Sequence, residues 1–409
     1  MGSDAATAHR DAAIAHEAYV ENLVASGALL SESVERAFRR VQRHRFLEHW
    51  YRLEASRLRA VWKRVEFDRD DPAPEGLAVV YSDRSLVTRV SGYLPTASSS
   101  QPSLVAKMLE AMELAPGMRV LEIGTGTGYN AALLAEIVEN PSDVYTIELQ
   151  EDVAAEAVAR LTTEGYGAIH VVNADAVLGS ADGAPYACIE ATVGCPDFSP
   201  RWLEELVPSG MMLIPLQHGH LHPLIRIVRS PMKPGRAVGR VVGQSAFMTM
   251  QGAMACANLW QSYLLGGLPD GPSWQEELPI PLPVGESDQD PLGDLEHRAF
   301  YFFLTLASRE LWRTNEGYGL ADPAGQATAI IAHDGLAICH RDGAEARAER
   351  LCARLCDLLR SWERLGRPSP DMYDIEFIPK EEQPTLGQET GREWVIERIR
   401  FWQVVRLSG

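Results

Sequence analysis

The sequence predicts an α/β protein with a parallel sheet covered by helices, preceded by a pair of helices and followed by a second, α+β domain. Between residues 117 and 216, short apolar runs typical of buried strands alternate with amphipathic runs typical of helices. A proline-rich stretch at residues 264–296 then reads as a linker. We therefore expect domains at 1–263 and 297–409.

The composition is that of an ordinary globular protein, and it argues against two classes of partner. The chain has 409 residues, of which 46% are hydrophobic and 23% are charged. Acidic residues outnumber Lys and Arg by 56 to 38, so the formal net charge is −18. Because the sequence shows no clear basic face, we expect neither a nucleic acid nor a membrane as partner.

Three features favour the cytoplasm. No apolar run reaches the ~20 residues that a membrane-spanning helix needs. The N-terminus lacks the basic flank and apolar core of a secretory signal. The six cysteines follow no regular framework, which is typical of a reducing compartment.

Residues 9–48 predict two helices ahead of the sheet. The side chains expected to be buried are Ile14, Tyr19, Leu23 and Val24 in the first helix and Val34, Phe38, Val41 and Phe46 in the second. We expect a loop at 68–77 and an amphipathic helix at 102–115 that begins at a proline.

The alternating region predicts strands at 118–124, 144–149, 168–174, 186–193 and 211–216, with helices at 129–139 and 151–165. In the C-terminal domain, we expect helices at 297–312 and 345–366 and a hairpin around Asp334-Gly335. Residues 392–407 are expected to form one strand with Ile399, Phe401, Val405 and Leu407 on one face.

The strongest functional signal is a glycine loop, Gly124 to Gly128, which follows a buried strand and precedes a helix. Glycines allow a sharp turn and a close approach of the backbone to a ligand. The dinucleotide fingerprint needs a glycine where this chain has Tyr129. The spacing suits S-adenosylmethionine (SAM), which has no pyrophosphate. A site for NAD, or a fold that binds no cofactor, is an alternative.

Two more strand ends carry hydrogen-bond acceptors. Glu148 lies 24 residues after Gly124, where its carboxylate can accept both ribose hydroxyls. Asp175 can accept from an adenine amino group, and the Ala176 N–H can bind a ring nitrogen. We therefore predict a Rossmann-like SAM-dependent methyltransferase sheet and no metal site. The expected cofactor contacts are Gly124, Thr125, Gly126, Thr127, Gly128, Glu148, Leu149, Asp175 and Ala176.

The order of these motifs resembles the protein-L-isoaspartate O-methyltransferase family over about residues 15–250. The resemblance is carried by Ser98-Ser99-Ser100-Gln101-Pro102, by the helix after it and by RVLEIGTGTGYNAALLA. It implies that Ser100 is the active-site serine and that Ser98, Ser99 and Gln101 contact the acceptor. Thr192, which ends the fourth strand, is expected to line the acceptor pocket.

The chemistry that this family implies needs no strong base. A carboxylate is ionised at neutral pH, so the enzyme has to align it with the donor methyl group and exclude water. The resulting methyl ester turns the oxygen into a leaving group, and the next backbone nitrogen can then close a succinimide. Glu190 departs from the family pattern, because the strand that carries it is normally apolar.

About 160 residues follow the expected end of this fold. The whole layout resembles the C-terminally extended actinobacterial members of the family that are associated with ribosomally synthesised lanthipeptide or graspetide pathways. That resemblance implies a modified precursor peptide as substrate, recognised by the C-terminal domain. A general repair methyltransferase, a non-catalytic SAM-binding partner of a peptide-modifying complex and a small-molecule O-methyltransferase are alternatives.

Other clusters have both functional and structural interpretations. His218, His220 and His222 alternate and could bind zinc, although a surface strand or loop is the simpler interpretation. Cys352 and Cys356 lie four residues apart on a helix, which favours core packing.

Two polar segments near the expected site are also open to more than one interpretation. The basic run Arg39, Arg40 and Arg43 could bind an acidic peptide, but a solvated helix face is simpler. Ser98–Ser100 could be only a helix-capping loop. Thr249 could contact the cofactor.

Overall fold

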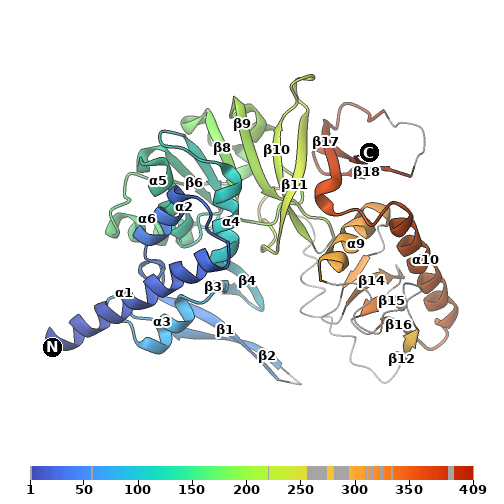
Figure 1. Ribbon diagram of the computed structural model, residues 1–409, viewed down its shortest axis with the longest axis horizontal. Helices are drawn as coiled ribbons and strands as arrows, with labels where there is room; N and C mark the ends of the chain where they lie inside the picture. The colour runs from blue at the N-terminus through green and yellow to red at the C-terminus, as the bar shows by residue number, and fades with distance from the viewer. Residues whose placement is uncertain are drawn as a thin grey trace. The chain divides into compact units, whose positions relative to one another are not determined.

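The computed structural model describes residues 2–56, 59–219, 221–255, 274–280, 294–308, 311–313, 317–322, 324, 326–332, 335–385 and 391–408 (Figure 1). The chain forms two compact units. The first consists of Met1–Leu216, Leu224–Ala237 and Ser245–Ala255, and the second of Gln217–Pro223, Val238–Gln244 and Cys256–Gly409. The second unit therefore includes two short segments that come before the C-terminal region.

Six neighbouring strands of the first unit follow the order β10-β9-β8-β5-β6-β7. The pairs among β5, β6, β7, β8 and β9 are parallel, and β10 is antiparallel to β9. This confirms the predicted α/β sheet with parallel strands. The strands are β5 (Val120–Ile123), β6 (Val144–Glu148), β7 (His170–Asn173), β8 (Tyr186–Ala191), β9 (Leu206–Pro215) and β10 (His222–Arg229).

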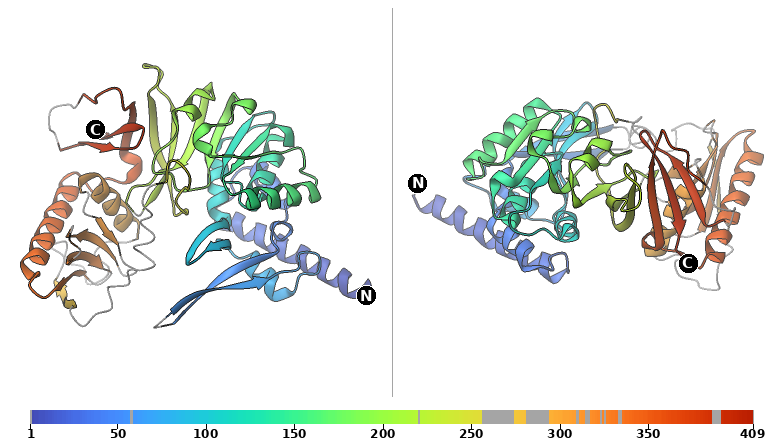
Figure 2. Two further views of the ribbon diagram at one scale, coloured as in Figure 1. Left: turned by 180° about the vertical axis from the view of Figure 1, so that it is seen from behind. Right: turned by 90° about the horizontal axis from the view of Figure 1, so that it is seen from above.

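One hydrophobic core joins helices α1, α2, α4 and α5 to this sheet, while the N-terminal end of α1 points away from the unit (Figure 2). Helix α4 begins at Pro102, as predicted, because a helix start can accommodate a residue without an N–H. The helices are α1 (Gly2–Ala25), α2 (Glu32–Arg40), α3 (Pro74–Val80), α4 (Pro102–Met112), α5 (Tyr129–Val138), α6 (Glu151–Thr163) and α7 (Pro200–Glu204). None of the helices among the described residues is both long and apolar enough to cross a membrane.

The buried face of α1 is narrower than predicted. Tyr19 and Leu23 are buried, but Ile14 and Val24 are 57% and 39% exposed, so their prediction was wrong. Val20, which follows Tyr19, is buried instead. All four positions expected to be buried around the second helix are confirmed.

Residues 49–99 contain a second, antiparallel sheet of order β2-β1-β3-β4 that was not predicted. Its β1–β2 hairpin projects from the rest of the unit (Figure 1). Strand β4 ends inside the predicted serine segment, at Ser99. The loop expected at 68–77 is partly wrong, because α3 begins inside it at Pro74. The strands are β1 (His49–Ser56), β2 (Arg59–Glu66), β3 (Leu86–Ser91) and β4 (Leu94–Ser99).

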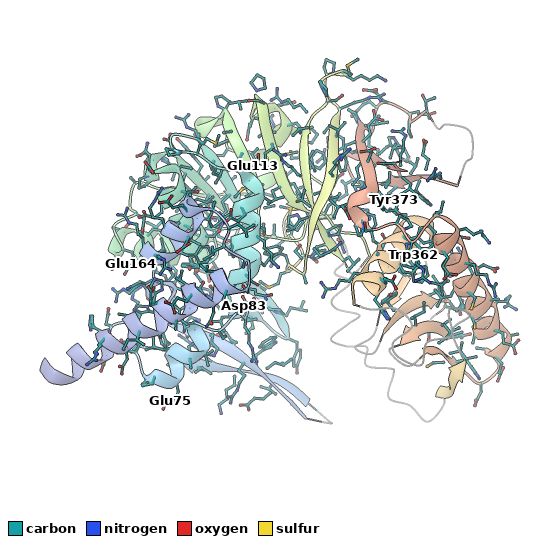
Figure 3. The ribbon with its side chains drawn as sticks, in the orientation of Figure 1. Glu75, Asp83, Glu113, Glu164, Trp362 and Tyr373 are labelled. Carbon is teal, nitrogen blue, oxygen red and sulfur yellow. The ribbon has the colours of Figure 1, made fainter. Side chains whose placement is uncertain are left out.

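The second unit contains strands in the orders β12-β16-β15-β14-β13 and β18-β19-β17-β11. Helices α9 and α10 share a core with the first of these sheets, and the fully buried Trp362 of α10 and Tyr373 of β17 are labelled in Figure 3. The elements are β11 (Ala237–Ser245), β12 (Trp274–Ile280), α9 (Asp294–Ala307), β13 (Leu311–Arg313), β14 (Gly317–Ala321), β15 (Ala327–Ala332), β16 (Gly335–Arg341), α10 (Glu345–Arg364), β17 (Tyr373–Pro379), β18 (Glu393–Glu397) and β19 (Phe401–Leu407).

Strands β15 and β16 confirm the predicted hairpin, with Ala332 opposite Gly335. Asp334 and most of the stretch 264–296 lie outside the described residues. The helix expected at 297–312 is wrong at its end, because α9 stops at Ala307 and β13 follows.

The single strand expected at 392–407 is wrong. The segment folds back on itself as the antiparallel pair β18–β19, with a turn in which the Arg398 N–H donates to the Phe401 carbonyl oxygen at 3.0 Å. Ile399 lies in this turn and is 46% exposed. Because no glycine, proline or asparagine marks the turn, the alternating pattern alone could not reveal it.

Candidate active site

The glycine loop connects β5 to α5 and lines a pocket at the carboxyl ends of the parallel strands. Gly124 has a φ of 101°, and a Cβ there would lie 2.8 Å from the Thr192 Oγ1. Gly126 has a φ of 53°, and a Cβ there would lie 3.2 Å from the Ser98 carbonyl oxygen. Both positions therefore require glycine, for backbone conformation and for space.

Most of the predicted site residues meet at this pocket. Those that line it are Ser98, Ser99, Ser100, Gly124, Thr125, Gly126, Thr127, Glu148, Leu149, Asp175, Ala176 and Thr192. Gly128 does not, because it caps the start of α5 and faces Leu161. Gln101 does not either, because its side-chain amide donates to Asp83 (labelled in Figure 3) at 3.0 Å.

Two carboxylates at successive strand ends are held by backbone N–H groups. Glu148 accepts from Gly126 at 3.1 Å and from Gln150 at 3.0 Å. Asp175 accepts from Val177 at 3.0 Å and from Ala253 at 2.7 Å. Each carboxylate oxygen retains a further lone pair. The pair can therefore accept hydrogen bonds from ribose hydroxyls and an amino group, as expected for SAM.

A segment after β11 completes the pocket. Met248, Thr249, Met250 and Gln251 line it. Gly194 fixes this segment, since its N–H donates to the Met248 carbonyl oxygen and its own carbonyl oxygen accepts from the Met250 N–H, both at 2.8 Å. Of these four residues, only Thr249 was considered from the sequence. No pattern in the sequence indicates that a segment more than 100 residues after the glycine loop lies beside it.

A buried arginine holds the backbone of the serine segment, residues 98–100. Arg43 is fully buried, and its guanidinium donates to the carbonyl oxygens of Ser99 at 3.3 Å and Ser100 at 3.0 Å. It also donates to the carbonyl oxygens of Val80 at 2.8 Å and Arg84 at 2.9 Å. One side chain thus ties the backbone before β3 to the backbone after β4.

We expected the basic run to lie on a solvated helix face, and this expectation is therefore wrong for Arg43. Helix α2 ends at Arg40, and Arg43 begins a 3₁₀ turn that directs it inwards. Burial lowers the pKa of the Arg43 guanidinium from its ordinary value. Arg40 remains exposed and pairs with Glu136 at 3.2 Å.

The two hydroxyls nearest to the expected chemistry differ in their surroundings. Among the described residues, the Ser100 side chain has no hydrogen-bond partner, and it lines the pocket. The Thr192 hydroxyl instead donates to the Gly124 carbonyl oxygen at 2.8 Å. Ser100 thus has a hydroxyl available to an acceptor, whereas Thr192 holds the glycine loop.

Comparison with known proteins identifies the family. A family model described as protein-L-isoaspartate(D-aspartate) O-methyltransferase matches residues 14–254. The chain belongs to this family. The protein-L-isoaspartate O-methyltransferase of Pyrococcus horikoshii is 35% identical over 211 residues, which cover 51% of this chain and 81% of the relative. That of Thermococcus onnurineus is 33% identical over 237 residues, or 57% and 91%.

Among solved structures, a protein-L-isoaspartate O-methyltransferase aligns with 88% of this chain and 96% of its own length, at 24% identity and a TM-score of 0.49. The family match makes this chain a SAM-dependent protein carboxyl methyltransferase. When bound, SAM supplies the methyl group. The side-chain-free cradle at Gly124 and Gly126 and the anchored carboxylates of Glu148 and Asp175 fit this cofactor.

A buried polar cluster borders the methyltransferase pocket, because Glu122 and Asn130 also line it. The Asn130 amide donates to Glu122 at 2.8 Å and to Glu190 at 2.9 Å, and Thr146 donates to Glu122 at 2.6 Å. Burial raises the pKa of Glu122 to about 8 and that of Glu190 to about 7. The remaining oxygens of Asn130 and Glu190 have no partner among the described protein atoms.

The other candidate clusters have structural surroundings. His218 and His222 are buried rather than on a surface strand, and the side-chain amide of Gln403 donates to the His218 Nε2 at 3.1 Å. His220 lies outside the described residues. Within the described ranges, no three His, Cys, Asp or Glu side chains are placed to hold a metal. Cys352 and Cys356 pack against the core of the second unit, as predicted.

Proposed function

We propose that this methyltransferase methylates an aspartate or isoaspartate side-chain carboxylate in a ribosomally synthesised modified peptide of the lanthipeptide or graspetide type. The observation that carries the proposal is the second unit. The family match ends at residue 254, whereas a folded core built around α9 and α10 follows it. A second unit provides surface by which one dedicated peptide can be distinguished from other proteins.

The pocket residues have separate tasks in this reaction. Ser100 orients the acceptor carboxylate by a hydrogen bond, and Arg43 fixes the backbone that carries Ser100. No proton has to be removed, because the acceptor is already ionised at neutral pH. The acceptor oxygen gains a methyl group and becomes an ester. Attack by the following backbone nitrogen then releases methanol and leaves a succinimide, which water opens to isoaspartate or aspartate.

Mass spectrometry tests this proposal. The full chain is incubated with SAM and with the modified precursor peptide encoded beside its gene, and in parallel with short unrelated isoaspartyl peptides. We expect one methyl group on a single aspartate of the precursor, followed by loss of methanol, and a kcat/KM at least about tenfold above that for the short peptides. Equal turnover of all peptides would instead indicate a general repair methyltransferase. Cofactor binding without methyl transfer to any peptide would indicate a non-catalytic partner.

We further propose that residues 297–409 recognise this peptide. Because Gln217–Pro223 and Val238–Gln244 also belong to the second unit, deletion of the C-terminal region would leave these segments without their partners. Hydrogen exchange on the full chain avoids that difficulty. Addition of the precursor peptide is expected to slow exchange in the second unit, for example in α10. Unchanged exchange throughout this unit, at a peptide concentration that saturates turnover, would contradict the proposal.

A further inference from the structure

One face of the β2-β1-β3-β4 sheet leads directly to the active-site pocket. Arg64 lies opposite Tyr51, Tyr51 lies opposite Val87, and Val87 lies opposite Ser98. Residues that face each other across antiparallel strands have side chains on the same side of the sheet. These four residues therefore form one row across all four strands, and its last member, Ser98, lines the pocket.

The row is part of a larger, partly exposed apolar surface. Leu53, two residues from Tyr51 along β1, is opposite Trp62 and is 39% exposed. The Trp62 indole N–H donates to the carbonyl oxygen of Tyr93 in the β3–β4 turn at 2.9 Å. Aromatic side chains with an apolar face and a polar tip are typical of binding surfaces. We call Tyr51, Leu53, Trp62, Arg64 and Val87 the hairpin face.

The hairpin also differs in charge from the rest of the protein. Residues 49–66 contain five Arg and Lys residues and two glutamates, whereas the whole chain has a net charge of −18. Arg52 and Lys63 lie on the face of the hairpin opposite to the row and share a single carboxylate, that of Glu54, at 2.6 Å and 3.7 Å. Arg64, in the row, pairs with Glu66 at 3.1 Å. Such exposed ion pairs are weak and can be exchanged for other partners. A negatively charged ligand is repelled by the protein as a whole but attracted to this hairpin.

We propose that the hairpin face binds the residues that flank the methylated aspartate, in an extended and acidic segment of the substrate peptide. The proposal rests on the proposed function and deepens it, because it names the charge of the peptide and the surface that holds it. The row from Arg64 to Ser98 provides the continuity, since a peptide whose aspartate is at Ser100 can extend along it. The aromatic side chains supply apolar contact, Arg64 is the basic residue of this face, and the net positive charge of the whole hairpin favours acidic neighbours.

Fluorescence anisotropy tests the proposal without any methyl transfer. The probes are two labelled peptides of equal length, each with one central isoaspartate. The first has glutamates on both sides, and the second has glutamines at the same positions. The protein variants are Arg64→Glu and Trp62→Ala. The matched control is Arg36→Glu, an exposed arginine of α2 that is paired with Glu139.

We expect the unaltered protein to bind the glutamate peptide at least about tenfold more tightly than the glutamine peptide, with a difference that shrinks as salt is added. Arg64→Glu is expected to remove most of this difference in affinity. Trp62→Ala is expected to weaken the binding of both peptides about tenfold. Arg36→Glu is expected to change neither affinity. Calorimetry with S-adenosylhomocysteine checks that each variant retains its cofactor affinity and is folded.

The outcomes separate this inference from the proposed function. Equal affinity of the unaltered protein for the two peptides would overturn the inference even if methylation proceeds. The inference would also be overturned if the Arg64→Glu and Trp62→Ala proteins bound both peptides as tightly as the unaltered protein does. Self-association of the protein that is abolished in Trp62→Ala would assign the hairpin face to a second copy of the chain and would also overturn it. The expected binding pattern without methylation of any peptide would support the inference and count against the proposed function.

Discussion

Arg43 and Ser100 are joined by a hydrogen bond of 3.0 Å, from the buried guanidinium to the backbone carbonyl oxygen of the serine. The arginine has no ion-pair partner among the described residues, so backbone carbonyl groups on both sides of the β3–β4 hairpin satisfy its charge. A buried charge is stable only when all its hydrogen bonds are made. The position of Ser100 at the pocket therefore depends on a residue that does not touch the substrate.

The first prediction is that Arg43→Gln lowers both stability and turnover. Loss of the guanidinium leaves several buried carbonyl oxygens without donors, so the free energy of unfolding should fall by about 3 kcal/mol. Arg43→Lys keeps the charge but lacks the planar fork, and it should restore only part of the loss. Urea unfolding and steady-state kinetics measure the two effects.

The control for this prediction is Arg36→Gln, which removes an exposed arginine that is paired with Glu139. Its free energy of unfolding should stay within about 0.5 kcal/mol of the unaltered protein. If Arg43→Gln were as stable and as active as this control, Arg43 would have no role in positioning Ser100.

The second prediction concerns the Ser100 hydroxyl. Ser100→Ala should lower kcat by at least about tenfold, because the acceptor carboxylate loses a hydrogen bond that aligns it. The affinity for S-adenosylhomocysteine should not change, because the backbone of the serine segment remains held by Arg43. Kinetics and calorimetry measure the two quantities. Ser142→Ala, in an exposed turn, is the control, and full activity of Ser100→Ala would remove this hydroxyl from the mechanism.

The third prediction separates backbone strain from loss of space in the glycine loop. Gly124→Ala introduces a Cβ 2.8 Å from the Thr192 Oγ1 at a φ of 101° and should weaken cofactor binding by at least about tenfold. Gly117→Ala is the matched control, because its φ is 77° but nothing lies within 4 Å of the new Cβ. That variant should lose about 1 kcal/mol of stability and keep its cofactor affinity. Equal cofactor affinities of the two variants would show that the cradle does not need glycine at 124.

The catalytic fold was predictable because its signals are local and periodic. The strand before Gly124 and the helix after Gly128 are read from a short stretch of sequence, and the strand ends at Glu148 and Asp175 follow from chain order. Arg43 was not predictable in this way. Its burial depends on carbonyl groups of Val80 and Arg84, about 40 residues away, and a sequence pattern carries no record of such contacts.

The antiparallel sheet of residues 49–99 was missed although its sequence alternates. Trp50 is buried and Tyr51 is half-buried, as expected for a strand with two unlike faces, but charged residues interrupt the apolar side. The single strand expected at 392–407 failed for the opposite reason. Alternation continues on both sides of the turn at Arg398–Phe401, so two strands look like one.

The fourth prediction is a pH dependence of stability that comes from Glu190. Its pKa is about 7 in the folded protein because of burial, above the ordinary value of 4.5. Between these values the folded protein holds a proton that the unfolded chain has released, so the free energy of unfolding should fall as pH rises. Glu190→Gln should reduce this slope and stabilise the protein at about pH 8 by on the order of 2 kcal/mol.

Urea unfolding between about pH 5 and pH 8 measures this effect. The control is Glu139→Gln, which replaces an exposed carboxylate and should leave the slope unchanged. Glu122, whose pKa is about 8, should keep part of the slope in the Glu190→Gln protein. A slope identical in the unaltered protein and in Glu190→Gln would show that Glu190 does not hold a proton in the folded state.

The most direct test of the whole account uses SAM labelled in its methyl group and an isoaspartyl peptide as acceptor. The account predicts that the label appears in the peptide and that mild base releases it as methanol, because a methyl ester of a side-chain carboxylate is labile to base. A peptide that gains no label, or one that gains a label stable to base, would contradict it.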